Sequence, residues 1–164
     1  MQKETSEKYT ALLKEYLNQY NDCKKYKHDL EKRLLAIDKE MEAPIGGQGY
    51  SPLPSNTNMT GAGSASLIFR KAEIEDRIMQ QQEQMVVIIN NIMSILDHLP
   101  VGNRGRRILE YKYIDSLPWE TIYKKMHLTK TPCFDYANDA YKKLLECKRV
   151  VYILEEYEKN IQEK

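Results

Sequence analysis

Residues 67–99 read LIFRKAEIEDRIMQQQEQMVVIINNIMSILDHL, and ten positions of this stretch follow one another at alternating steps of three and four. A mean spacing of about 3.5 residues places one narrow apolar seam along a helix and makes paired helices supercoil. The stretch therefore predicts a long helix that pairs with a second helix. The ten positions are Leu67, Lys71, Ile74, Ile78, Gln81, Met85, Ile88, Ile92, Ile95 and Leu99.

A second seam of the same length lies upstream. Its ten positions are Tyr9, Leu13, Tyr16, Tyr20, Cys23, Lys27, Leu30, Leu34, Ile37 and Met41. Since the two seams match in length, the simplest arrangement is an antiparallel, coiled-coil-like helical hairpin over residues 5–99. Lys27 is the one polar residue of the upstream seam. It lies either at a solvent-facing edge or where it fixes the register of the pair.

The segment between the seams, residues 43–66, is rich in Gly, Pro, Ser and Asn. Such a composition buries too little apolar surface to become ordered, so we expect a flexible loop. Thr5 or Ser6 should cap the start of the first helix, and Pro44 should end it. Ser64 or Ser66 should start the second helix, which should run to about residue 97.

The second half of that helix, residues 85–99, has apolar residues on most of its surface. Those outside the seam are Val86, Val87, Ile89, Met93 and Leu96. A helix that is apolar nearly all round is buried on several sides. We therefore expect it to pack also against the C-terminal part of the chain or a second subunit.

Charge, cysteine content and hydropathy limit the classes of protein to which the chain can belong. The net charge of +1 says nothing about nucleic acid, but residues 101–149 hold 11 Lys or Arg against 6 Asp or Glu, a bias typical of small DNA-binding modules. The three cysteines are odd in number and far apart, so we expect no disulfide framework, zinc site or cofactor. The polar N-terminus and the short apolar runs predict a cytoplasmic protein without a membrane segment.

Residues 101–164 form the second expected domain, a module of short helices. We predict helices at 104–113, 119–126 and 130–145, with a three-residue turn at 127–129. Pro118 suits a helix start, and Thr129 can cap the last helix. Two short helices joined by a tight turn form a helix-turn-helix layout. No breaker follows, so the last helix should extend to about residue 160. No pattern of period two occurs, and the whole chain is predicted to be all-α.

Residues 106–146 read RRILEYKYIDSLPWETIYKKMHLTKTPCFDYANDAYKKLLE. This stretch resembles the C-terminal DNA-binding region of sigma factors, region 4. The whole layout is similar to the phage-encoded RinA/ArpU-type transcriptional regulators, which place a helical part and a Ser/Pro/Gly-rich loop before such a module. The chain has Tyr123 where the family usually has Ala, and His127 where it usually has Gly at the turn. Pro132 is acceptable because it falls in the first helical turn.

The resemblance implies promoter DNA as the partner, and host RNA polymerase as a second partner at the surface where region 4 docks. The family's base-facing positions fall on Lys130, Thr131, Phe134, Asp135 and Asn138. Lys130 would bond guanine, Asp135 would accept from cytosine, and Thr131 and Phe134 would touch a thymine methyl. An alternative is that this helix is only a solvated charged surface.

Phosphate contacts would come from five basic residues outside the reading helix: Arg104, Arg106, Arg107, Lys124 and Lys125. Ordinary solvated charges are the alternative reading of the Arg106–Arg107 pair. Trp119 is expected to pack between the helices of the module, and Cys133 to lie in its core.

The sequence is therefore compatible with three functions. The first is a phage or prophage DNA-binding transcriptional regulator, in which a homodimer would suit two DNA half-sites. The second is a protein-interaction adaptor built on the coiled-coil helices, without DNA binding. The third is a small terminase-like DNA-packaging subunit. An enzyme is not expected, because no catalytic or metal-binding motif occurs in the sequence.

Overall fold

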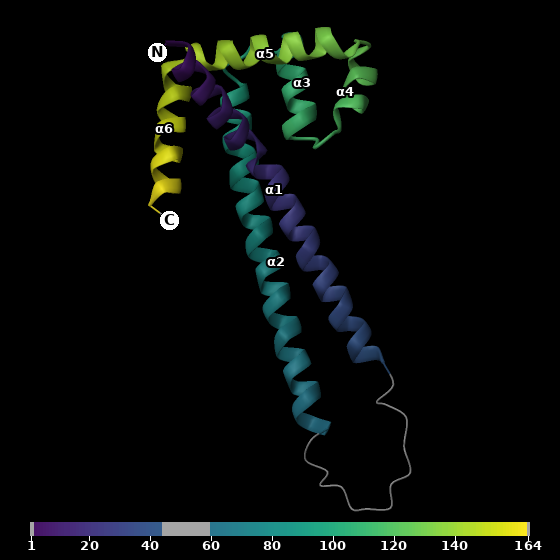
Figure 1. Cartoon of the computed structure of the whole chain (residues 1–164). Coiled ribbons are helices and arrows are strands. Elements are labelled where there is room, and N and C mark those ends of the chain that lie inside the picture. Colours follow the sequence, from purple (N-terminus) through teal and green to yellow (C-terminus); the bar gives the residue numbers. More distant parts are fainter. Residues whose placement is uncertain (1, 44–59, 164) are drawn as a thin grey trace, which may run out of the picture. The chain divides into compact units, whose positions relative to one another are not determined.

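The computed structural model describes residues 2–43 and 60–163, with side chains described over 6–43 and 64–163. Within these ranges the chain is all-α and contains no strand. The helices are α1 (Gln2–Glu42), α2 (Thr60–Leu96), α3 (Arg104–Tyr113), α4 (Trp119–Met126), α5 (Lys130–Glu146) and α6 (Lys148–Gln162) (Figure 1). No described helix is long and apolar enough to cross a membrane.

The bounds of α3 and α4 match the sequence prediction, and α5 begins at Lys130 as predicted. The long helices begin earlier than predicted. α1 begins at Gln2 rather than after Thr5 or Ser6, because the Gln, Lys and Glu residues at the N-terminus are good helix formers. α2 begins at Thr60, so residues 60–66 of the expected loop are helical instead. The remainder of that loop, residues 44–59, lies outside the described residues.

The prediction of one extended last helix is wrong. α5 ends at Glu146, Cys147 adopts an extended conformation with φ −81° and ψ 113°, and α6 begins at Lys148. The break lets Val150 and Leu154 of α6 enter the core, where both are fully buried. Burial of these two apolar side chains, rather than a Gly or Pro, accounts for the change of direction.

The chain divides into two compact units. The smaller, Lys24–Gln84, contains the second part of α1 and the first part of α2. These segments run antiparallel, with Leu30 and Ile37 buried and Lys71 Nζ 2.7 Å from the Asp38 carboxylate (Figure 1). Lys27 is partly buried, and its ion pair at 3.1 Å is with Glu31 on its own helix, which fits a solvent-facing edge position.

The larger unit, Met1–Cys23 with Met85–Lys164, has one core to which all six helices contribute. Its buried residues are Leu12, Leu13, Leu17, Ile92, Ile95, Leu96, Leu99, Ile108, Leu109, Tyr113, Ile122, Cys133, Ala137, Ala140, Tyr141, Leu144, Val150 and Leu154. The short helices therefore share their core with the long ones.

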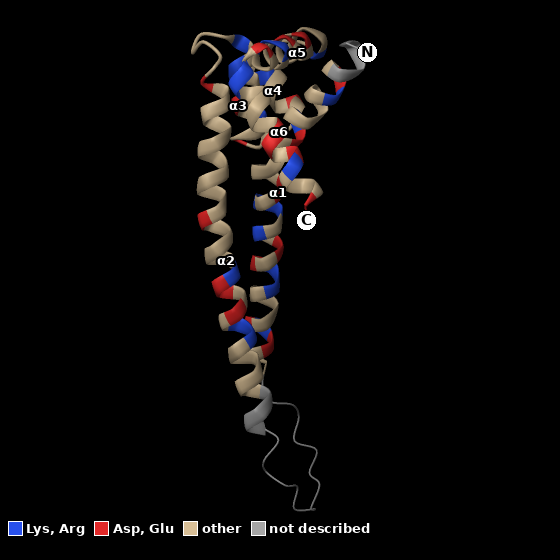
Figure 2. Cartoon of the chain, turned by 90° about the vertical axis from the view of Figure 1, so that its left-hand side faces the viewer, with Lys and Arg blue, Asp and Glu red and all other residues tan. Residues whose placement is uncertain are grey.

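The outer surface of α2 is covered only in part by the C-terminal helices, and a second subunit remains the other predicted cover. Val86, Val87 and Met93 are exposed, so the single chain does not cover this part of the helix. Lys and Arg are absent from residues 84–96, which form an uncharged stretch of the ribbon (Figure 2). Of the positions outside the seam, Leu96 is fully buried and Ile89 is partly buried.

Candidate nucleic-acid interface

The turn between α4 and α5 has a defined backbone geometry. His127 lies in the left-handed region, with φ 53° and ψ 41°. Its N–H donates to Lys124 O at 3.2 Å, and the N–H of Leu128 donates to Tyr123 O at 3.0 Å. Such bonds satisfy the last carbonyls of a helix and turn the chain sharply. A His at this place costs backbone strain that a Gly would not.

A close helix crossing fixes α5 against α3. A Cβ atom on Gly105 would lie 2.5 Å from the Tyr136 carbonyl oxygen and 2.7 Å from Ala140 Cβ. The small side chains of Ala137 and Ala140 are buried at the same helix surface. Further along, the hydroxyls of Tyr113 and Tyr141 are 2.8 Å apart and buried. Burial raises the pKa of both phenols above the ordinary value.

An aromatic cluster fixes α5 against α4. The ring centroid of Trp119 is 4.6 Å from that of Phe134, and the Tyr123 ring is 6.1 Å from Phe134. The expectation that Trp119 packs between helices is thus confirmed. Phe134 is partly buried in this cluster, which argues against its predicted role as a freely projecting base contact. Tyr123 fits in place of Ala because its ring lies beside these aromatic side chains.

The remaining predicted base-reading residues lie on the exposed surface of α5. Lys130, Thr131, Asp135 and Asn138 are all exposed, and none has a side-chain partner among the described residues. Thr129 occupies the cap position, but its side chain makes no capping bond. Pro132 is one reason, because it is the third helical residue and has no N–H to offer such a cap.

The charge of α5 is balanced. Lys130, Lys142 and Lys143 are matched in number by Asp135, Asp139 and Glu146. The helix alone therefore provides no net attraction for a polyanion, and basic residues beside it must supply one.

The predicted phosphate-contacting residues divide into two groups. Arg104, Arg107, Lys124 and Lys125 are exposed. Arg104 donates to the Tyr136 hydroxyl at 3.1 Å, which holds it against α5, and Lys125 lies 5.4 Å from the Tyr111 ring centroid. Arg107 has no side-chain partner in the part of the chain that the structure describes.

Arg106 has a different role from the one predicted. Its side chain is only 15% exposed, and its guanidinium donates to Leu99 O at 2.8 Å, to Glu110 at 2.8 Å and to Asp97 at 2.7 Å. The bond to Glu110 raises the pKa of Arg106 further, as does the bond to Asp97. Arg106 therefore joins the end of α2 to α3 and is not available to a phosphate.

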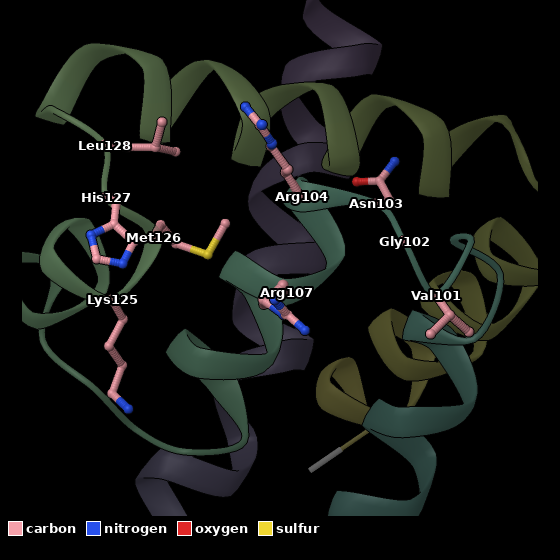
Figure 3. A pocket seen from close by; sticks show the side chains of 9 residues that line it. All are labelled: Val101, Gly102, Asn103, Arg104, Arg107, Lys125, Met126, His127 and Leu128. Carbon is pink, nitrogen blue, oxygen red and sulfur yellow. The ribbon is translucent and has the colours of Figure 1, made fainter.

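A pocket of about 420 Å³ lies between the start of α3 and the turn that follows α4. Figure 3 shows Lys125 and His127 on one side of it and the residues before α3 on the other, with Arg104 and Arg107 between them. Its lining residues are Val101, Gly102, Asn103, Arg104, Arg107, Lys125, Met126, His127 and Leu128. None of them is acidic.

Several contacts that position the helices could not be predicted from the sequence. Gly105, Tyr141 and the internal bonds of Arg106 depend on contacts between helices, and only the repeated small residues Ala137 and Ala140 hinted at a close crossing. Cys133 is fully buried, as predicted, and burial raises the pKa of its thiol. No group of three potential metal ligands occurs among the described side chains.

Comparison of the chain with known proteins identifies no related protein. No protein-family model matches the chain, and neither does any curated protein or solved structure.

Proposed function

We propose that this chain is a DNA-binding transcriptional regulator of the phage or prophage type, similar to the RinA/ArpU-type regulators. In this proposal α3, α4 and α5 form a sigma region 4-like helix-turn-helix, and α5 enters the major groove. The supporting observation is that the exposed surface of α5 carries unpaired polar side chains, while α3 and α4 of the same compact unit carry exposed cations, of which Arg104 contacts α5 through Tyr136.

Base reading falls to the exposed residues of α5. Lys130 at the N-terminal end has the reach and charge to donate to guanine O6 and N7. Thr131 would contact a thymine methyl, and Asp135 would accept from cytosine N4. Asn138 lies one turn further along the same surface. Phe134 contributes by holding α5 against α4 through Trp119, rather than by projecting into the groove.

Phosphate binding falls to Arg104, Arg107, Lys124 and Lys125. These four exposed cations compensate for the neutral reading helix and would provide the salt-dependent part of the affinity. Asp135 and Asp139 are exposed on the same helix as Lys130, so the net attraction of α5 for DNA phosphates is modest. We expect weak non-specific binding, because few phosphates are neutralised.

The long helices α1 and α2 would act as a spacer or oligomerisation arm. The exposed Val86, Val87 and Met93 support a homodimer, since an uncharged apolar helix surface suits an equally uncharged partner surface. A dimer would present two α5 helices to two half-sites. Host RNA polymerase is the second proposed partner, through the region 4-like module.

The test is duplex binding by fluorescence anisotropy, with genomic fragments recovered by immunoprecipitation from the native host. Lys130→Ala should weaken binding to the recovered site by about 1–3 kcal/mol, because one bidentate base contact is lost. Arg106→Ala is the matched control: it should lower the stability of the fold and leave the affinity of the folded protein nearly unchanged. Failure of the wild-type protein to bind any duplex at low salt would contradict the proposal.

A protein-interaction adaptor is the second candidate, favoured by the exposed Asp135 and Asp139 on α5. These carboxylates would be repelled by DNA phosphates but would suit a basic protein surface. Recovery of no discrete genomic site, together with stable capture of a basic partner that Asp135→Asn abolishes, would favour the adaptor. A closed ring in solution would instead favour the terminase-like alternative.

A further inference from the structure

The pocket between α3 and the α4–α5 turn is lined by three cations and one histidine. Arg104, Arg107, Lys125 and His127 line it, and no acidic side chain does. Like charges around one cavity repel one another, and a bound anion would relieve that repulsion.

The neighbouring Arg106 provides an internal comparison. Arg106 forms ion pairs with two carboxylates, that of Asp97, which follows α2, and that of Glu110, which lies on α3 itself. Arg107, one residue further along, has no partner among the described residues. The two adjacent arginines are therefore used differently: one is paired within the fold, and the other is left facing a cavity with its charge uncompensated.

The backbone at the pocket adds to its preference for anions. α3 begins at Arg104, so the positive end of the helix dipole and its first N–H groups lie at the pocket. Asn103 Oδ1 accepts from the Arg106 N–H at 3.1 Å, which leaves the earlier N–H groups of the first turn without that cap. A cavity of about 420 Å³ accepts a phosphate group with its attached atoms.

We infer that this pocket is a phosphate-binding site, in which Arg104, Arg107, Lys125 and His127 would turn their polar ends toward the oxygens of one phosphate group. His127 is the distinctive member, because Gly at the same left-handed position would provide no donor. The chemistry is the same for a phosphodiester of duplex DNA and for a free phosphorylated compound. Assigning the phosphate to DNA rests on the proposed function, whereas the site itself does not.

The first experiment titrates the full-length chain with inorganic phosphate at constant ionic strength, using chloride as the reference anion. Backbone amide shifts of residues 104–107 and 125–128 are followed by NMR, and the midpoint of thermal unfolding is measured in parallel. We expect saturable shifts confined to these residues and a higher midpoint in phosphate. Arg107→Ala should weaken the phosphate affinity about tenfold.

His127→Gly is the second variant, because Gly accepts the left-handed backbone and the fold should not suffer. It should weaken phosphate binding while the unfolding midpoint without phosphate stays equal or rises. Lys148→Ala, an exposed cation of α6 away from the pocket, is the control and should bind phosphate like the wild type. Absence of saturable shifts, or equal shifts in Arg107→Ala and wild type, would overturn the site.

A parallel measurement of binding to duplex DNA distinguishes the two sources of phosphate. If DNA provides it, Arg107→Ala should weaken duplex binding and reduce the slope of log affinity against log salt by about one. If Arg107→Ala changes only the phosphate titration, the site serves a free phosphorylated compound. Saturable phosphate binding by a chain that binds no duplex would support the pocket and refute the DNA-binding proposal, so the two failures are distinguishable.

Discussion

Gly105 is the residue on which the position of α5 depends most directly. An added Cβ would lie 2.5 Å from a backbone carbonyl of α5, and backbone moves less readily than the end of a side chain. Gly105→Ala should therefore lower the free energy of unfolding by about 1–3 kcal/mol, although Ala is the better helix former by about 1 kcal/mol. Urea denaturation followed by circular dichroism measures this change.

Gly102 provides the matched control, since a Cβ there would meet nothing within 4 Å. Gly102→Ala should leave the denaturation midpoint within experimental error of the wild type. Equal effects of the two substitutions would show that α3 and α5 do not cross as closely as described.

At the same scale, the sequence could not reveal which residues carry tertiary contacts. Arg106 and Arg107 are adjacent and chemically identical, yet only Arg106 finds Asp97 and Glu110. Phe134 was predicted to face a base, but the sequence does not show that its ring packs against Trp119 and Tyr123. Such choices depend on how the helices pack, and neighbouring residues in the sequence do not determine them.

Among helices, Tyr113 of α3 and Tyr141 of α5 form a buried hydroxyl pair at 2.8 Å. Tyr141→Phe would leave the Tyr113 hydroxyl buried without its partner, which should cost about 1–3 kcal/mol of unfolding free energy. The double variant with both residues changed to Phe removes both hydroxyls. It should therefore cost less than the sum of the two single changes. A double-mutant cycle by urea denaturation measures the coupling.

The single Tyr113→Phe variant completes this cycle. Strictly additive effects would mean that the two hydroxyls do not interact in solution. Activity is not needed as a readout, so this test holds whatever the function of the chain.

Helix positions were the most predictable feature, because they depend on local signals. Pro118 and the apolar spacing around it defined α4, and Pro44 correctly marked the end of α1. The break at Cys147 carries no such signal. It arises because Val150 and Leu154 gain burial when α6 turns into the shared core. The exposed surface of α5 was likewise predictable from periodicity, whereas the pocket beside it required the packing of α3 against α4.

At the scale of the whole molecule, buried tyrosines make the free energy of unfolding depend on pH in the alkaline range. Burial raises the pKa of Tyr113, Tyr141 and Tyr16, and burial together with Glu15 raises the pKa of Tyr157 to about 12. The unfolded chain loses these protons near pH 10 while the folded chain retains them. The stability that they contribute is therefore complete below pH 10 and is lost as the pH rises through the folded-state values.

Two fully buried groups such as Tyr113 and Tyr141 would each steepen this loss by up to about 1.4 kcal/mol per pH unit. Urea midpoints measured from pH 8 to pH 11.5 should be flat at first and then fall above pH 10. Because Tyr141→Phe lacks one of the buried phenols that titrate, its stability should fall less steeply over the same range, despite being lower at pH 8. A decline of equal slope in both proteins would mean that water reaches the Tyr141 phenol in the folded chain, and that α3 and α5 do not enclose it as described.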